Sequence, residues 1–222
     1  MEIRDRIAHG YFFAKSYIIK KGYANEIDWQ DELDYDSLTE QKFLEEFSWV
    51  VIASGLNDKV VRKTFPAIKK NMFDFKSCEL IVKQKKKCMI NGLEVFNHKG
   101  KINAILFAAE YIHKHSFEMV KLKIMIEGVN FIQTFPYMGK ATAYHLAKNL
   151  GLNVAKPDRH LIRISNLLGY EDPNTFCKDL SFQIEEKISL IDLVLWRYAT
   201  IDRNYIKNIR WYLESNNNEH SS

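Results

Sequence analysis

Apolar residues recur three or four positions apart along most of this chain, which is the spacing of one face of an α-helix. Two clear runs are Ile102, Ile105, Leu106, Ala109 and Ile112, and then Ile184, Ile188, Ile191, Leu195 and Tyr198. No stretch sustains the alternation of apolar and polar positions typical of a strand, although residues 88–95 could hold a short extended turn. The pattern therefore predicts an all-α fold, with about ten helices of ordinary length.

One early helix is predicted from its expected start. Ser37 and Glu40 have the spacing of a capping box, and five positions after them, four of them apolar, share one helix face. These positions are Phe43, Phe47, Val50, Val51 and Ser54. Asn57 and Asp58 interrupt the pattern, and we expect the next helix to stop at Pro66, because the residue before a proline disfavours helical geometry.

The segment 131–169 has the most distinctive organisation. A short helix comes first, and residues 136–139 (PYMG) make a tight connection to a second helix, which Gly151 ends in the left-handed position. After a loop, Asp158 is placed to cap a third helix that ends before Gly169. The order is thus helix, hairpin, helix, loop, carboxylate, helix.

The length of 222 residues is enough for one large domain or two closely joined lobes. We expect a single domain over residues 1–214, built as two helical lobes with a cleft between them. One lobe would span about residues 40–150, and the other would combine residues 1–39 with residues 151–214. The polar residues 215–222 are expected to be a disordered tail.

Charge and cysteine content exclude some classes of protein but do not identify one. A formal net charge of +4 is compatible with a polyanionic partner but is common in proteins that bind no nucleic acid. The three cysteines form no C-x-x-C pair, which argues against a disulfide framework, a zinc knuckle and a four-cysteine iron–sulfur cluster. We recognise no signal peptide and no apolar run of transmembrane length, so we expect a cytoplasmic protein without a membrane partner.

The hairpin and the helix after it form a candidate anion site. Gly139 lets the backbone approach a ligand closely, and the first N–H groups of the next helix have no partner within that helix. Together with the helix dipole they favour a phosphate, and Lys140 adds a charge and Thr142 a hydroxyl. Such a site would hold a nucleic-acid backbone without reading its sequence.

Asp158 indicates a different chemistry. A carboxylate that caps a helix start is held in its ionised form and in a fixed direction. Such a group can stabilise developing positive charge and orient an attacking water. The local sequence around Asp158 fits a purely structural cap equally well.

Three blocks of sequence carry a family resemblance. Residues 49–66 resemble an early core helix with its DNA-facing loop, and residues 96–101 (FNHKGK) resemble a G-x-x-N-x-K-A segment. Residues 135–143 (FPYMGKATA) and 157–163 (PDRHLIR) resemble the patterns L-P-G-V-G-x-K-T-A and V-D-x-H-x-x-R. In this order and spacing, over roughly residues 40–170, they resemble the helix-hairpin-helix DNA glycosylase superfamily, which includes endonuclease III and adenine glycosylase.

The resemblance implies that the protein flips a damaged base out of double-stranded DNA and hydrolyses its N-glycosidic bond, leaving an abasic site. Asp158 would stabilise the oxocarbenium-like state and orient the water. The implied DNA-contacting residues are Tyr137, Met138, Gly139, Lys140, Ala141, Thr142, Asn97, Lys99 and Asn57. Lys101 is a further candidate for backbone contact, and Trp49 is a candidate wall of the base pocket.

The resemblance also implies which cofactor is bound and which residue inserts into the DNA double helix. It implies a monovalent cation held by backbone carbonyls at the hairpin, while no other cofactor and no metal site are expected. The usual wedge position falls near Gly55, so Leu56 or Asn57 would fill that role. We expect a monomer that works in the cytoplasm, associated with the nucleoid.

Two departures from the family pattern change the expected chemistry. Tyr137 replaces the first hairpin glycine, so the turn is either reshaped or presents an aromatic ring to DNA. Ala141 stands where bifunctional members carry the Schiff-base lysine, and the iron–sulfur cysteines of some relatives are missing. The resemblance therefore implies a monofunctional glycosylase that uses water as the nucleophile.

Two alternatives remain open. One is a non-catalytic helix-hairpin-helix protein that binds DNA, and the other is a bifunctional glycosylase/AP lyase that would use Lys140 or Lys156. His160 fits local packing better than a role as a base. The sequence does not rank the lesions, although a cationic alkylated purine, already a good leaving group, would demand least from the pocket.

Overall fold

The computed structural model describes residues 3–214, and all regular elements within this range are helical, which confirms the all-α prediction. The range divides into two compact units: unit 1 contains residues 3–33 and 152–214, and unit 2 contains residues 34–151. No helix of the described range is long and apolar enough to cross a membrane. The predicted tail, residues 215–222, lies outside the described residues.

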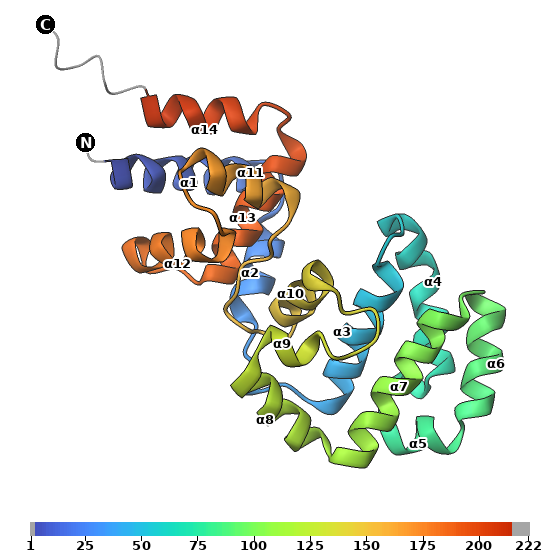
Figure 1. The fold of residues 1–222 in the computed structure, drawn as a ribbon. Coiled ribbons are helices and arrows are strands. Elements are labelled where there is room, and N and C mark those ends of the chain that lie inside the picture. Colours follow the sequence, from blue (N-terminus) through green and yellow to red (C-terminus); the bar gives the residue numbers. More distant parts are fainter. Residues whose placement is uncertain (1–2, 215–222) are drawn as a thin grey trace, which may run out of the picture. The chain divides into compact units, whose positions relative to one another are not determined.

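Unit 1 is organised around one central helix. Its helices are α1 (Ile3–Lys20), α2 (Ala24–Glu32), α11 (Arg159–Leu167), α12 (Pro173–Ile184), α13 (Ile188–Ile201) and α14 (Tyr205–Glu214). α13 contacts each of the other five (Figure 1). Ile191, Val194 and Tyr198 of α13 are buried together with Tyr11 and Ile18 of α1, so α13 forms the centre of the core of unit 1.

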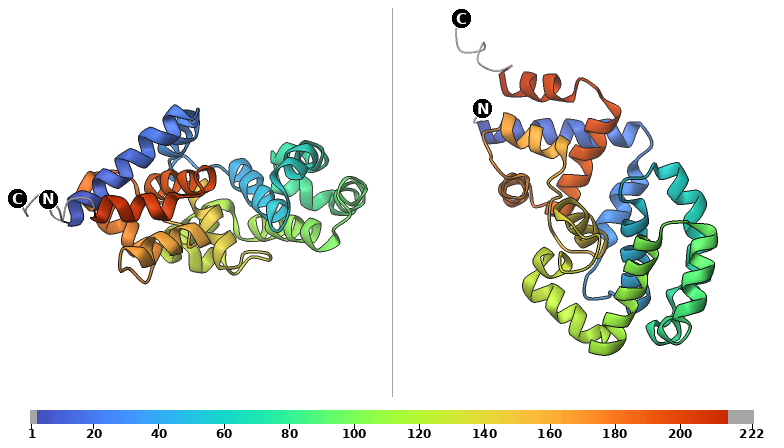
Figure 2. Two further views of the ribbon diagram at one scale, coloured as in Figure 1. Left: turned by 90° about the horizontal axis from the view of Figure 1, so that it is seen from above. Right: turned by 45° about the vertical axis from the view of Figure 1, so that its right-hand side comes forward.

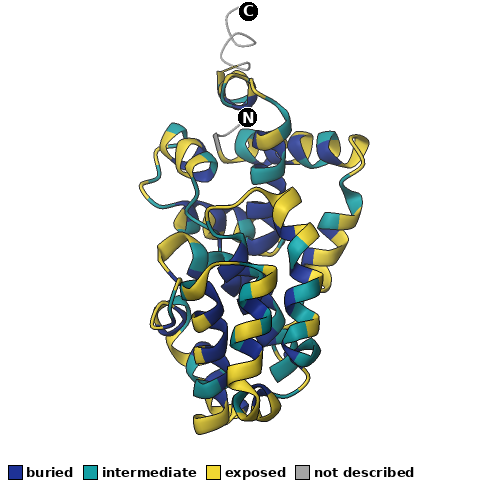
Figure 3. Cartoon of the chain, turned by 90° about the vertical axis from the view of Figure 1, so that its right-hand side faces the viewer, coloured by how far each residue is buried: buried dark blue, intermediate teal, exposed yellow. Residues whose placement is uncertain are grey.

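Unit 2 is also wrapped around one helix. Its elements are α3 (Glu40–Ala53), α4 (Asp58–Asn71), η1 (Phe73–Phe75), α5 (Cys78–Lys83), α6 (Lys85–Val95), α7 (Lys99–His115), α8 (Phe117–Glu127), α9 (Val129–Ile132) and α10 (Lys140–Asn149). α7 packs against α3, α5, α6 and α8 (Figures 1 and 2). Its predicted apolar face, Ile102 to Ile112, is buried, and Figure 3 shows the same division into buried and exposed sides on other helices.

The start of α3 differs from the predicted capping box. Thr39 is the N-cap, and its hydroxyl oxygen accepts the backbone N–H of the third residue after it at 3.2 Å. Ser37 instead donates to the carbonyl of Asp34 at 2.9 Å, and a Glu40 carboxylate oxygen accepts the N–H of Cys78 at 2.8 Å. The capping box is therefore wrong, while the predicted apolar face of this helix is buried except for its last member, which is half-buried.

The predicted stop at Pro66 is also wrong. α4 runs through this proline, which lacks the N–H needed for one helical hydrogen bond. Phe65 and Ile68 on either side of Pro66 are buried, and the burial of two large apolar side chains offsets the lost bond.

Two other boundaries differ from the sequence pattern. Residues 88–95 lie within α6 and not in an extended turn. The apolar run that begins at Ile184 spans two helices, because Glu185 between them adopts a left-handed conformation with φ of 56°.

Residues 34–39 belong to unit 2, not to the lobe with the N-terminus as expected. Hydrogen bonds to α8 hold this segment. The Tyr35 hydroxyl donates to the carbonyl of Lys121 at 2.7 Å. The Lys121 ammonium in turn donates to the carbonyls of Asp36 at 2.6 Å and Leu38 at 3.2 Å.

Gly151 follows α10 in the predicted left-handed position, with φ of +91°. A Cβ at this residue would lie 2.7 Å from the backbone nitrogen of Tyr35 and 3.0 Å from the carbonyl carbon of Asp34. The glycine is therefore required both by its backbone conformation and by the close approach of a second backbone segment.

We expect Gly151→Ala to lower the free energy of unfolding by roughly 2–3 kcal/mol, because strain at positive φ adds to a clash with backbone atoms. Gly22→Ala is the matched control, since Gly22 has φ of +90° and nothing within 4 Å of the added Cβ. It should lose only about 1 kcal/mol. Urea unfolding measures both values, and equal losses would show that the contact with residues 34 and 35 costs nothing.

Candidate nucleic-acid interface and capping carboxylate

The hairpin between α9 and α10 is closed by its own polar groups. The N–H of Met138 donates to the carbonyl of Phe135 at 3.2 Å. The Thr142 hydroxyl lies 2.9 Å from the carbonyl oxygen of Tyr137 and 3.0 Å from that of Gly139. This hydroxyl therefore stabilises the turn, a role that the sequence did not indicate.

The start of α10 is open to solvent. Its N-cap, Gly139, contributes no side-chain hydrogen bond to the first turn, and Lys140 and Ala141 are exposed. No described hydrogen bond starts from the N–H groups of these two residues, so both groups can bind an anion beside the lysine. The far end of α10 is fixed in the core, where the amide of Asn149 donates to Glu46 at 2.9 Å.

The Tyr137 side chain lies on the start of α7. Its ring meets that of His98 edge to face, with centroids 6.0 Å apart, and a Cβ at Gly100 would overlap the Tyr137 hydroxyl. His98 stacks on Phe96 with centroids 5.9 Å apart and caps α7, since its Nδ1 accepts the N–H of Lys101 at 3.3 Å. The structure thus brings the hairpin together with the 96–101 block, about forty residues away in sequence.

The predicted DNA-contacting residues differ in exposure. Asn97 and Lys99 are exposed next to the start of α7, and Tyr137 is 40% exposed. Met138 is only 3% exposed, so its side chain is a core residue of the hairpin and is not available to DNA. The prediction that Met138 contacts DNA is therefore corrected: its side chain packs within the hairpin.

Lys101 is also not a surface residue. Its ammonium donates to the carbonyls of Ile52 at 2.8 Å and Ser54 at 2.6 Å, and burial lowers its pKa. These carbonyls end α3, so Lys101 satisfies them and fixes the chain just before the 55–57 loop. Lys101 is therefore not placed to contact phosphate, as had been predicted, and instead positions that loop.

The 55–57 loop is exposed throughout. The Asn57 side-chain oxygen accepts the N–H of Lys59 at 2.9 Å and caps α4. Leu56 is 39% exposed at the tip, so it is the better placed of the two predicted wedge residues.

Trp49, the predicted pocket wall, is half-buried against α4. Its ring meets Phe65 edge to face at 5.0 Å, and the Arg62 guanidinium lies 5.7 Å from its centroid. The described contacts of Trp49 are thus packing contacts within unit 2.

Asp158 caps α11, as predicted. Its Oδ1 accepts the backbone N–H groups of His160 at 2.8 Å and Leu161 at 2.9 Å. Within the described range no hydrogen bond ends on Oδ2, and the residue is half-buried. One oxygen therefore fixes the carboxylate while the other can accept a further donor.

The segment that leads to Asp158 is tied down at three points. The N–H of Ala155 donates to Asn174 of α12 at 3.0 Å, and the N–H of Lys156 donates to Asp192 of α13 at 3.0 Å. The side chain of Asn153 accepts the N–H of residue 189 at 3.1 Å. These anchoring residues were missed in the sequence, because nothing local to residues 153–158 points to partners on other helices.

Two basic side chains flank the carboxylate. Burial lowers the pKa of Lys156, against the opposing attraction of Asp158. Burial also lowers the pKa of His160; Asp158 opposes this shift, and Arg159 and Arg163 add to it.

The hydrogen bonds of His160 define its neutral form. Nε2 accepts from Arg159 Nε at 3.2 Å, which leaves Nδ1–H to donate to the Tyr205 hydroxyl at 3.2 Å. This agrees with the expectation that His160 bonds locally.

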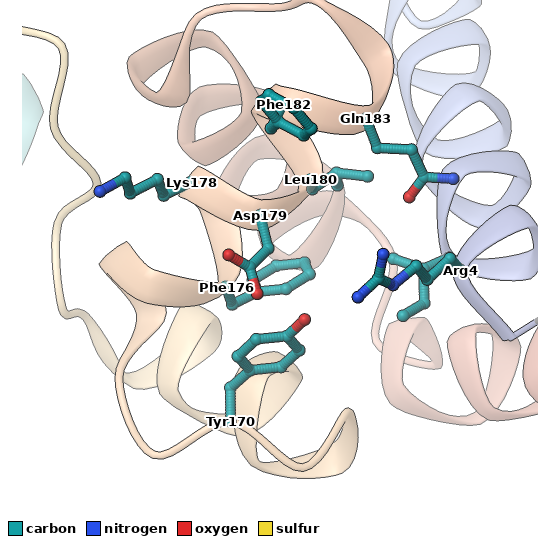
Figure 4. A pocket seen from close by; sticks show the side chains of 9 residues that line it. Arg4, Tyr170, Phe176, Lys178, Asp179, Leu180, Phe182 and Gln183 are labelled. Carbon is teal, nitrogen blue, oxygen red and sulfur yellow. The ribbon is translucent and has the colours of Figure 1, made fainter.

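Unit 1 also has an open pocket of about 390 Å³ that holds none of the predicted site residues. α1 and α12 form it, together with the loop before α12. Figure 4 shows Tyr170 and Asp179 facing each other, with the Arg4 side chain of α1 pointing toward them. Because Asp158 is not among its lining residues, we assign no step of base release to this pocket.

No protein-family model matches the sequence, and a comparison with curated proteins finds no match either. The helices and their order nevertheless define an all-helical fold that is found in a solved structure. The fold is similar to that of the Methanocaldococcus jannaschii 8-oxoguanine glycosylase/lyase, in a crystal structure with a 15mer DNA containing 8-oxoguanine. The TM-score is 0.53 at 15% identity, and the match covers 88% of this chain and 97% of that chain, so the likeness is one of fold.

We expect the protein to lose less stability on acidification when His160 is replaced in His160→Gln. In the wild type the neutral imidazole is favoured in the fold, so the unfolded chain takes up a proton first as the pH falls below about 6.5. Stability from this group is full above that pH and is lost as the pH falls through the lowered folded pKa. The melting temperature should therefore fall less in the variant between about pH 7.5 and about pH 5. His9→Gln, at an exposed position, is the control, and identical pH profiles for wild type and His160→Gln would contradict the assignment.

Proposed function

We propose that the protein is a DNA glycosylase of base excision repair, which flips a damaged base and hydrolyses its N-glycosidic bond. The observation that carries this proposal is the state of Asp158: one oxygen is fixed by two helix N–H groups, and the other takes part in none of the described hydrogen bonds. The fold of a DNA glycosylase and the open start of α10 support it.

DNA would be held through its backbone. The N–H groups at the start of α10 and the Lys140 ammonium bind phosphate, and Asn97 and Lys99 bind a neighbouring part of the strand. Leu56 fills the space in the stack that the flipped nucleotide leaves. These contacts carry no sequence preference, as an enzyme that inspects many sites requires.

Asp158 would act on the flipped nucleotide. As the bond from C1′ to the base breaks, its electron pair leaves with the base and positive charge develops on the sugar. The Asp158 carboxylate stabilises that charge and directs a water whose oxygen bonds to C1′, while the water's proton passes to the carboxylate and then to solvent. The product is an abasic site in an unbroken strand.

The monofunctional assignment rests on Ala141, which has no amine to form a Schiff base with the sugar. Water is therefore the nucleophile, and the bond from C3′ to oxygen stays intact. A monovalent cation held by backbone carbonyls of the hairpin would add positive charge beside the strand.

The substrate class is damaged double-stranded DNA, acted on by a monomer in the cytoplasm, at the nucleoid. The DNA bound by the structural neighbour contains 8-oxoguanine, which supports that lesion as one to test. Alkylated purines are the other, because their positive charge already weakens the glycosidic bond.

We expect Asp158→Asn to slow single-turnover base release by at least about 100-fold, because the negative charge below the sugar is lost. An asparagine still caps α11, so duplex binding should stay within about twofold of the wild type. Asp172→Asn is the matched control, since Asp172 is also an N-cap, accepting the N–H of Thr175 at the start of α12, and it should keep full activity. The assay is chromatography of bases freed from a lesion panel. A wild-type protein that binds these duplexes and releases no base would favour the non-catalytic alternative.

Borohydride reduction separates the two enzymatic alternatives. We expect no protein–DNA adduct when the wild type is reduced on a duplex that contains an abasic site, because residue 141 carries no amine. A covalent adduct would contradict the monofunctional assignment, and Lys140→Ala and Lys156→Ala would then identify the reacting amine.

A further inference from the structure

Tyr137 has a backbone conformation that normally belongs to glycine. Its φ is +66°, and a residue with a Cβ is disfavoured there. Such a conformation persists only where the surroundings hold it, and such residues cluster at functional sites. At Tyr137 the surroundings are the start of another helix, because the ring lies against His98 and Gly100.

The residue against which the Tyr137 ring lies, His98, is itself held in place. His98 stacks on Phe96 and accepts the N–H of Lys101. The Lys101 ammonium in turn donates to two carbonyls at the end of α3. Contacts therefore run without a gap from the hairpin to the start of α7 and on to the carbonyls just before the 55–57 loop. Gly100 is the one position in this path where a methyl group would displace the Tyr137 hydroxyl.

We infer that Tyr137 is a positioning residue that joins the hairpin and the start of α7 into one surface for the phosphate backbone of a DNA strand. The inference rests on the proposed binding of DNA and adds how its two backbone contacts are held in register. The exposed groups on the two elements that the ring joins are Lys140 on one and Asn97 and Lys99 on the other. Because their spacing is set before DNA arrives, binding requires less ordering of the protein.

Two other roles for Tyr137 predict different outcomes. A ring that touched DNA directly carries no charge, so displacing it with a methyl group at Gly100 would weaken binding and leave the salt slope unchanged. A purely structural ring would change stability and leave the number of phosphate contacts unchanged. Variants at residue 100 separate these roles, because they move the ring without removing a proposed DNA-contacting group.

The experiment measures anisotropy of a labelled, undamaged duplex over a range of salt concentrations, with Gly100→Ala, Tyr137→Phe and the double variant. Gly100→Ala should weaken binding by about fivefold and lower the slope of log K against log salt by about one. Tyr137→Phe lacks the overlapping oxygen, so the double variant should regain the affinity and the salt slope of Tyr137→Phe alone. Gly10→Ala in α1, where the added Cβ meets only Tyr212 at 3.7 Å, is the control.

Each outcome decides the question. A Gly100→Ala protein that binds with wild-type affinity and salt slope overturns the positioning role. A double variant as weak as Gly100→Ala also overturns it, because the methyl group itself would then obstruct the strand. Urea unfolding of the same variants detects a loss of fold, and lower stability with an unchanged salt slope overturns the inference in favour of a structural ring. A wild type that binds no duplex overturns the proposed function together with this inference.

Discussion

The free N–H groups at the start of a helix must find acceptors, and at α11 the acceptor is the carboxylate of Asp158. This requirement fixes Oδ1 between two N–H groups and leaves Oδ2 without a described hydrogen bond. The segment before it is held through Asn174 and Asp192, so the carboxylate cannot easily turn away. A negative charge in a set direction is what a developing sugar cation needs, and the proposed chemistry depends on it.

Unit 2 uses the same physical requirement in two other ways. The carbonyls that end α3 are satisfied by a buried lysine, Lys101, which fixes the chain before the 55–57 loop. The N–H groups that begin α10 receive no side chain and stay open to an outside anion. A helix end that the protein satisfies becomes a rigid support, and one that it leaves unsatisfied becomes a candidate for binding.

The sequence predicted those features that depend on neighbours in the chain. Helical spacing identified the buried face of α7, and Asp158 and Gly151 were recognised at the two ends of the loop because capping is a local effect. Features that depend on distant partners were not predictable in this way. Pro66 lies inside a helix because its neighbours are buried. Lys101 points inward because its ammonium donates to two carbonyls at the end of α3. Tyr137 adopts its conformation against a ring and a glycine about forty residues away.

The most direct test of the central claim compares the binding of two abasic analogues in duplex DNA, one with a cationic nitrogen in the sugar ring and one with a neutral tetrahydrofuran. If the Asp158 carboxylate stabilises sugar cation, the wild type should prefer the cationic analogue by about 100-fold. This preference should largely disappear in Asp158→Asn. Equal affinity of the wild type for both analogues would contradict the account, since no charge would then be held where the cation forms.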